Sequence, residues 1–211
     1  MLEVRSAWKE CTNCYIVHDE KSKETMVIDP GGEPDRVMEL LDILQANVKY
    51  IYLTHCHGDH IAGVNEIKQK KGGKTLIHVE DAESVNNPEI NMCPYMNMKP
   101  EYIEIDARVN DGDLLHVGDI ELKVIHTPGH TKGGSSLYSE KDKMLFSGDT
   151  LFKGTWGRTD LPTSDFKDVI NSISNKLLIL PDSTIVYPGH GEVTTIREEE
   201  PIYYNLKPRE D

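Results

Sequence analysis

A short apolar, β-branched run that ends beside glycine and is followed by histidine or aspartate occurs four times in this chain. The segments are 54–63 (THCHGDHIAG), 126–131 (HTPGHT), 147–150 (SGDT) and 187–191 (YPGHG). In proteins built on sheets, functional side chains gather where strands end along one edge. We therefore expect the four segments to meet at one edge of a sheet.

Apolar runs bounded by turn residues predict eight strands. They cover residues 15–18, 25–29, 50–54, 75–79, 121–126, 135–139, 143–147 and 184–187. Apolar residues at helical spacing predict three helices, the last of them the weakest: 37–44, 166–177 and 61–71. Ser164 or Asp165 would cap the second helix, and Gly72-Gly73 would end the third. Strands and helices mixed through the whole length predict sheets covered by helices.

Composition limits the classes of partner. Of 211 residues, 36 are acidic and 23 are basic, which leaves a formal net charge of −13. Such a surface repels nucleic-acid phosphates and anionic lipid, although bound divalent metals would reverse the field locally. No apolar stretch is long enough to cross a membrane, and no signal peptide is visible at the N-terminus. The length predicts one domain that covers residues 1–211.

Cysteine is sparse, with four residues in the chain, and this content suits the reducing cytoplasm. Cys11 and Cys14 form a CxxC pair, but no second pair follows to complete a zinc ribbon. The pair runs into the strand predicted at 15–18, where residues three apart face opposite sides of a sheet. We expect packed thiols here rather than a metal or redox site.

Segment 54–63 carries the strongest chemical signal. In extended backbone His55 and His57 point the same way, so their imidazoles can bind one cation. Asp59 and His60 follow at the turn into the next helix and offer two more ligands. Four such groups within six residues would be costly to bury unpaired, whereas a metal pairs all of them.

A lone histidine at a strand end is more often a satisfied loop residue than a ligand. The strong signal of the first segment nevertheless makes metal binding more favoured for the ligand-type residues beside glycine in the other three segments, which are His130, Asp149 and His190. The remaining histidines have no comparable neighbours in the sequence, and we interpret them as structural: His18, His78, His116 and His126.

The stretch THxHxDHxxG, followed by TPGHT, GDTLF and a late PGHG, resembles the metallo-β-lactamase superfamily, and within it the glyoxalase II-like hydrolases. The motifs span residues 54–191, and the order of the predicted strands outside them also fits. The resemblance implies an α/β (α+β) fold, a four-layer αβ/βα sandwich of two mixed sheets flanked by helices. It also implies a metal site at one edge of the sandwich.

Carried over to this chain, the resemblance implies two divalent metal ions. The ligands would be His55, His57 and His130 for the first ion, and Asp59, His60 and His190 for the second. Asp149 would bridge the two ions together with a water or hydroxide. Each ion keeps an open position, as catalytic sites do. Such ligands suit zinc, iron and manganese, of which zinc is favoured here.

The implied reaction is hydrolysis of an acyl thioester such as S-lactoylglutathione. Two cations about 3.5–4 Å apart lower the pKa of a bridging water, so that hydroxide exists at neutral pH. The hydroxide would attack a carbonyl polarised by one ion, with Asp59 and Asp149 as the candidate catalytic residues. No cysteine nucleophile is needed. Cys56 stands between two predicted ligands that point toward the metals, so it points away from them, and we expect a packed thiol.

Other reactions of similar proteins stay open. Common dizinc metallo-β-lactamases have a cysteine where this chain has Asp149, which argues against β-lactams. A persulfide dioxygenase would use one iron, held by His55 or His57 with His130 and Asp149. The second ligand set favours the dinuclear hydrolase, for which a lactone or another small ester is a further possible substrate. A metal-binding module without activity is disfavoured because no ligand position is missing.

We expect substrate binding to differ from that of full-length glyoxalase II. Only 21 residues follow His190, so we expect no C-terminal helical domain that binds glutathione. Lys153 or Arg158 is the candidate to bind a carboxylate of the small-molecule substrate instead. In the alternative interpretation Arg158 pairs with Asp160 or Asp165 and only braces its loop.

Two segments lack a clear period. Residues 83–100 are rich in proline, asparagine and methionine, and predict either a surface loop or a lid over the site. Residues 197–201 (REEEP) predict a solvated face followed by a short tail. The sequence does not specify the oligomeric state.

Overall fold

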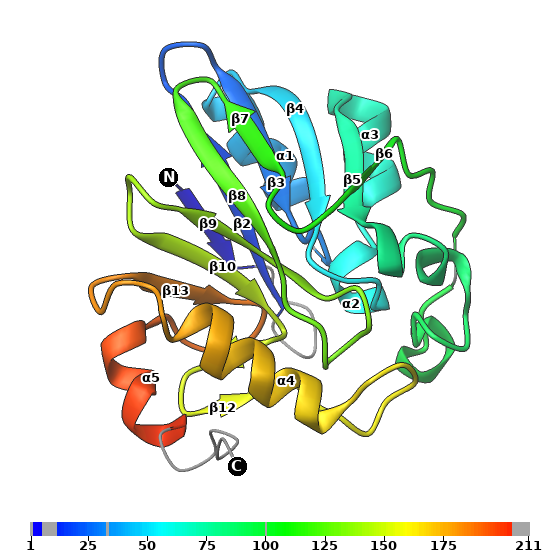
Figure 1. The fold of residues 1–211 in the computed structure, drawn as a ribbon. Helices are drawn as coiled ribbons and strands as arrows, with labels where there is room; N and C mark the ends of the chain where they lie inside the picture. Colours follow the sequence, from blue (N-terminus) through cyan, green and yellow to red (C-terminus); the bar gives the residue numbers. More distant parts are fainter. Residues whose placement is uncertain (1, 6–11, 33, 100, 204–211) are drawn as a thin grey trace.

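Successive residues of the strands are buried on opposite faces, and this pattern produces a layered architecture. In strand β2 (Asn13–His18), Tyr15 and Val17 lie in one apolar cluster, whereas Cys14 and Ile16 lie in another. A sheet that is apolar on both faces must be covered on both sides. The computed structural model describes residues 2–5, 12–32, 34–99 and 101–203, and shows two sheets packed face to face with helices outside (Figure 1). The predicted four-layer sandwich of mixed sheets is therefore confirmed.

The first sheet has six strands in the order β1-β2-β3-β4-β5-β6. Their bounds are β1 Leu2–Arg5, β2 Asn13–His18, β3 Glu24–Ile28, β4 Asn47–Leu53, β5 Lys74–His78 and β6 Ala107–Val109. Strands β3 to β6 are parallel, while β1–β2 and β2–β3 are antiparallel pairs. Because parallel strands end at the same edge, the residues that follow β3 and β4 come close together.

The second sheet has the order β14-β13-β10-β9-β8-β7. Its bounds are β7 Leu114–Val117, β8 Ile120–His126, β9 Ser135–Ser139, β10 Met144–Gly148, β13 Ile185–Pro188 and β14 Thr194–Thr195. Strands β10 and β13 are parallel, so the residues after these two strands also meet at one edge. A small hairpin, β11 (Leu151–Phe152) with β12 (Thr155–Trp156), follows β10.

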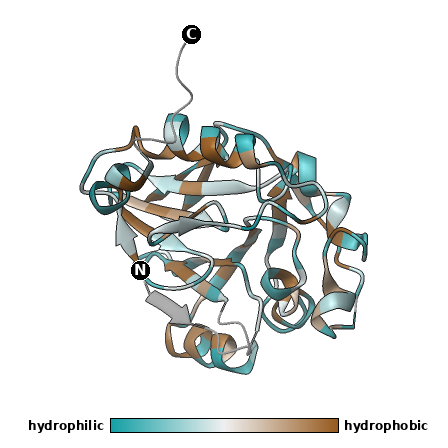
Figure 2. Cartoon of the chain, turned by 90° about the horizontal axis from the view of Figure 1, so that it is seen from below, coloured by the Kyte–Doolittle hydropathy of each residue, from teal (hydrophilic) through white to brown (hydrophobic). Residues whose placement is uncertain are grey.

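Helices close the two outer faces. The first sheet is covered by α1 (Pro34–Ile43) and α3 (Val64–Lys71), and the second by α4 (Phe166–Ser172), the π-helical turn η4 (Ile173–Leu177) and α5 (Ile196–Tyr203). Short helical turns are α2 (Gly58–Ile61), η1 (Val79–Asp81), η2 (Ser84–Asn86) and η3 (Cys93–Met96). Figure 2 shows helices on the outer sides carrying both hydrophobic and hydrophilic residues. No helix in the described part of the chain is long and apolar enough to cross a membrane.

Most predicted elements are present. All eight predicted strands form, with ends displaced by at most three residues, and the helices predicted at 37–44 and 166–177 are α1 and α4–η4. Of the two candidate caps for α4, Asp165 is the one that accepts hydrogen bonds, from the backbone N–H groups of Lys167 and Asp168. The strands not predicted are the short or terminal ones: β1, β6, β7, β11, β12 and β14.

Two predictions need correction. The helix predicted at 61–71 forms as α3 and ends before Gly72 as predicted, but it starts only at Val64, because a break separates it from α2, which ends at Ile61. At the break the N–H of Gly63 donates to the carbonyl of Pro30 over 2.7 Å, and a Cβ on Gly63 would lie only 2.7 Å from that oxygen. The segment 197–201 is not a solvated face throughout, because Glu199 is 1% exposed within α5.

Candidate metal centre

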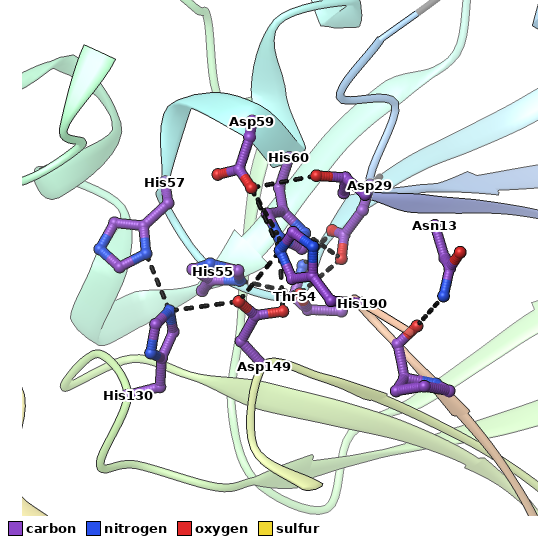
Figure 3. A network of polar contacts seen from close by, with 12 residues as sticks. Asn13, Asp29, Thr54, His55, His57, Asp59, His60, His130, Asp149 and His190 are labelled. Carbon is purple, nitrogen blue, oxygen red and sulfur yellow. Dashed lines mark hydrogen bonds and ion pairs between the residues drawn. The ribbon is translucent and has the colours of Figure 1, made fainter. Parts of the chain in front are cut away.

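The seven predicted ligands lie together where strands of both sheets end (Figure 3). They come from five points of the fold: His55 and His57 after β4, Asp59 and His60 on α2, His130 after β8, Asp149 after β10 and His190 after β13. A glycine allows the close approach of the last segment, since a Cβ on Gly189 would lie 2.2 Å from Asp149 Oδ1. The predicted convergence at one edge of the sandwich is therefore observed.

One group of potential ligands consists of histidines alone. One ring nitrogen each of His55, His57 and His130 lies within 4.8 Å of the others, and all three residues are buried. His57 Nδ1 and His130 Nε2 are 2.9 Å apart. His130 donates its Nδ1–H to the carbonyl of Arg158 over 2.9 Å, which leaves the lone pair of this ring on Nε2. We call these three residues the first ligand group.

A second group contains a carboxylate. Potential ligand atoms of Asp59, His60 and His190 also lie within 4.8 Å of one another. His190 Nε2 lies 3.2 Å from His60 Nε2 and 3.2 Å from Asp59 Oδ2. His60 is fully buried, and the side chains of Asp59 and His190 are 14% and 24% exposed. These three residues are the second ligand group.

Asp149 lies between the two ligand groups. Its Oδ2 is 3.4 Å from His130 Nε2 of the first group and 3.4 Å from His190 Nε2 of the second. Its Oδ1 is 3.4 Å from His60 Nε2. A carboxylate in this position is suited to contact two cations at once.

The sequence interpretation missed Asp29, which directly follows β3. Asp29 Oδ1 accepts from the backbone N–H of Thr54 (2.8 Å), and Oδ2 accepts from the Thr54 hydroxyl (2.6 Å) and from His60 Nδ1 (2.9 Å). Because Thr54 gives its hydroxyl hydrogen to Asp29, it accepts from His55 Nδ1 at 3.1 Å. Both carboxylate oxygens are thus engaged, and Asp29 acts as an acceptor that orients ligands. The signal was available, since Asp29 stands beside Pro-Gly-Gly at a predicted strand end.

Burial and neighbouring imidazoles keep His55 and His57 of the first ligand group neutral. Burial, together with His60, lowers the pKa of His55 well below its usual value. Burial and the adjacent His130 lower the pKa of His57 to about 3. Neutral imidazoles are the form that binds metals.

The second ligand group is surrounded by negative charge. Burial on its own would lower the pKa of His60 and of His190, but the carboxylates of Asp149 and Asp59 raise these pKa values to about 9 and about 11. Burial would raise the pKa of Asp149, but His190 and His60 hold it well below its usual value. The two carboxylates therefore stay ionised and attract positive charge to this point.

These side chains fit divalent metal ions. Among the described residues, His55 Nε2 and Asp149 Oδ1 are buried without a hydrogen-bond partner, which is unfavourable unless something else pairs with them. Histidine nitrogens and carboxylate oxygens are the donor set of zinc, iron and manganese. The neutral imidazoles of His55 and His57, close to the ionised carboxylates of Asp59 and Asp149, support metal binding here.

The other residues singled out in the sequence lie outside the two ligand groups. Lys153 pairs with Glu192 at 2.6 Å, and Arg158 forms two hydrogen bonds with Asp160, at 2.9 and 2.8 Å. The remaining histidines have other surroundings: His18 contacts Thr25, His78 stacks on His126, and His116 is exposed. Cys14 and Cys56 are buried free thiols, as predicted, while Cys11 lies outside the described residues.

Known proteins share this fold and much of this sequence. The model of the metallo-beta-lactamase superfamily matches residues 11–190. The hydroxyacylglutathione hydrolase GloC of Haemophilus influenzae is 34% identical over 194 residues, which cover 89% of each chain.

Two solved structures are also similar. The B3 metallo-beta-lactamase BLEG-1 superposes with a TM-score of 0.90 at 32% identity, covering 98% of this chain and 99% of its own. TTHA1623, solved in a di-iron-bound form, has a TM-score of 0.83 at 29% identity, covering 94% and 96%. Together with the histidine and carboxylate cluster, these matches show that the chain belongs to the metallo-beta-lactamase superfamily of metal-dependent hydrolases.

Proposed function

We propose that this protein is a single-domain, dinuclear thioesterase of the glyoxalase II kind, which hydrolyses an S-lactoylglutathione-like acyl thioester. The observation that carries the proposal is the meeting of two ligand groups at Asp149, which lies 3.4 Å from a histidine of each. The similarity to a hydroxyacylglutathione hydrolase over 89% of the chain supports this substrate class. We also propose a cytoplasmic location, from the sparse cysteine content.

Each ligand group would hold one divalent ion. His55, His57 and His130 would hold the first ion, and Asp59, His60 and His190 the second. Asp149, close to a histidine of each group, would serve both. Two such ions, for which we favour zinc over iron or manganese, supply a hydroxide nucleophile at neutral pH and polarise the substrate carbonyl.

The residues themselves provide orientation and charge. Asp149, ionised and 9% exposed, keeps the two ligand groups at a fixed separation. Asp59 is held through Oδ2 by Thr12 and His190, so its carboxylate is oriented to accept a hydrogen bond from the attacking water. Lys153 and Arg158, with exposed side chains near the segment that follows Asp149, are the proposed contacts for a substrate carboxylate. Water adds to the acyl carbon, and the products are a carboxylic acid and a thiol.

The test is steady-state hydrolysis of S-lactoylglutathione with and without a metal chelator. We expect chelator-sensitive turnover with kcat/KM above about 10⁴ M⁻¹ s⁻¹. Asp149→Ala should abolish the activity and lower the metal content, whereas His126→Ala, which alters a histidine outside both ligand groups, should change neither. Full turnover with stoichiometric metal in Asp149→Ala would refute the shared role of this carboxylate.

A second candidate is a persulfide dioxygenase with one iron. The first ligand group with Asp149 suffices for a single ion, and TTHA1623 holds iron in a similar fold. Oxygen consumption with glutathione persulfide, in a protein that retains its metal but leaves S-lactoylglutathione intact, would favour this reaction. The substrates to be tested beside S-lactoylglutathione and glutathione persulfide include a lactone and, because of the similarity to BLEG-1, a β-lactam.

A further inference from the structure

The second ligand group is assembled from distant parts of the chain, and the start of β2 connects them. Asp59 is carried by α2 next to the first sheet, and His190 follows β13 of the second sheet. Thr12 forms an isolated antiparallel bridge with His190. The Thr12 hydroxyl also donates to Asp59 Oδ2 over 3.0 Å. One residue therefore contacts both the carboxylate and the backbone of the histidine.

Asn13 fixes the turn that carries His190. Its side-chain amide donates to the carbonyl of Pro188 and to that of Gly191, each over 3.0 Å. Its backbone N–H donates to the carbonyl of Gly189 over 2.7 Å. Asn13 is 3% exposed and lies beside the metal-centre network in Figure 3. A primary amide has two N–H donors, so Asn13 can satisfy both carbonyls only while the turn keeps this shape.

The first ligand group is held by other residues. His55 is oriented by Thr54 and Asp29, and His130 by the carbonyl of Arg158. None of these three anchors belongs to β2, so a change at its start acts most directly on the second ligand group.

We propose that Thr12 and Asn13 are positioning residues that set the affinity of the second metal ion, without contacting that ion. They hold Asp59 and His190 at the separation that a shared cation requires. The inference deepens the proposed dinuclear function and rests on it. Residues that orient metal ligands in this way change metal affinity by about 10- to 100-fold when they are removed.

The experiment counts bound zinc in the full chain. Zinc-loaded protein is dialysed against buffers of graded free zinc, and the zinc per chain is measured by elemental analysis. We expect two equivalents in the unaltered protein. In Asn13→Ala and in Thr12→Val the first equivalent should bind as before, while the second should need about 10- to 100-fold more free zinc.

Two control variants isolate the effect. Thr12→Ser keeps the hydroxyl and should bind both equivalents like the unaltered protein. Asn86→Ala removes another asparagine that makes two hydrogen bonds, both to the backbone of Ile103 at 2.9 Å, and it should leave both zinc affinities unchanged. Circular dichroism confirms folding, and Thr12→Val, which is nearly isosteric, keeps the test valid if Asn13→Ala does not fold.

Three results would overturn the inference. Unchanged binding of the second equivalent in both variants would show that the contacts do not position it. Equal weakening of both equivalents would show a general structural role. Uptake of one equivalent by the unaltered protein would refute the dinuclear site itself, and this failure is recognised before any variant is measured.

Discussion

At the scale of single residues, one buried carboxylate connects the two ligand groups. Asp29 bonds directly to His60 of the second group, and through the Thr54 hydroxyl to His55 of the first. Each hydrogen bond engages Nδ1, which leaves Nε2 of both rings directed toward the centre. The orientation of histidines in different groups thus depends on the same side chain, that of Asp29.

Replacing Asp29 by asparagine should weaken both metal ions together. An amide oxygen is a weaker acceptor than a carboxylate, and the amide NH2 would face a donor, Thr54 or His60, on its other side. We expect metal affinity and kcat to fall by about 10- to 100-fold, measured by elemental analysis and steady-state kinetics. Asp106→Asn is the matched control, because Asp106 also accepts from a backbone N–H, that of Thr75. Loss of only one ion would contradict the connecting role of Asp29.

Arg158 tests whether an exposed cation binds the substrate. Its ion pair with Asp160 is exposed, with both side chains more than two-thirds accessible, and such pairs contribute about 0–1 kcal/mol. A substrate carboxylate can therefore displace Asp160. Arg158→Ala should raise KM by about tenfold and leave kcat nearly unchanged. An unchanged KM would show that Arg158 only stabilises its loop through Asp160. The control is Arg108→Ala, which removes a surface partner of Glu83 and should leave KM unchanged.

The seven candidate ligands were predictable because their residue types and spacing have few structural explanations. The residues that hold them were not, since a threonine, an asparagine or a lone aspartate fits many turns equally well. Thr12 and Asn13 lie between the two cysteines of the CxxC pair, a pattern that indicates thiol chemistry. The contacts with the second ligand group are nevertheless made by Thr12 and Asn13. Pairing across about 175 residues of sequence is visible only in the folded chain.

At the scale of elements, the C-terminal helix supports the hairpin that borders the metal centre. Glu199 of α5 accepts from the Thr194 hydroxyl (2.7 Å) and from the backbone N–H of Gly154 (2.8 Å) in the β11–β12 turn. The Tyr203 hydroxyl donates to the carbonyl of Thr155 over 2.7 Å. The hairpin in turn brings Phe152 against the ring of His190, with centroids 5.9 Å apart.

Glu199→Ala should release this hairpin. The Gly154 N–H would lose its acceptor, and the buried Thr194 hydroxyl would keep only Glu198 Oε2, 3.0 Å away, as an acceptor. We expect this loss to lower the free energy of unfolding by about 1–3 kcal/mol in urea denaturation. KM should rise as well, because Lys153 lies in the same hairpin. Glu200→Ala alters an exposed neighbour on the same helix and should leave both quantities unchanged. If the variant kept its free energy of unfolding and its KM, α5 would not support the hairpin beside the metal centre.

The shortest of the elements that were missed lack a sequence period of their own. Strands β11, β12 and β14 have two residues each, too few to show alternation. In α5, consecutive glutamates predict a solvated face, but Glu199 points inward where two polar donors need an acceptor. The break between α2 and α3 depends on the carbonyl of Pro30, which is distant in sequence. Periodicity predicts elements that bury apolar faces, and these exceptions are fixed by polar contacts.

At the scale of the whole molecule, stacked histidines connect the two sheets away from the metal centre. His78 at the end of β5 and His126 at the end of β8 have ring centroids 4.0 Å apart and planes inclined by 12°. Burial and the neighbouring His126 lower the pKa of His78 to about 4. A charged imidazole is disfavoured there because it would face a second ring with little access to water.

This stack should make the fold sensitive to mild acid. The unfolded chain protonates His78 near pH 6.5, whereas the folded chain does so only near pH 4, so the unfolded state binds more protons between these values. The contribution of His78 to stability should therefore be constant above pH 6.5 and fall, by about 1–3 kcal/mol, as the pH drops toward 4. Urea denaturation of His78→Gln across this range should give a shallower fall than the unaltered protein, because glutamine does not titrate. His116→Gln, which removes an exposed histidine, should reproduce the original slope, and parallel curves for all three proteins would show that the stack has no role in acid sensitivity.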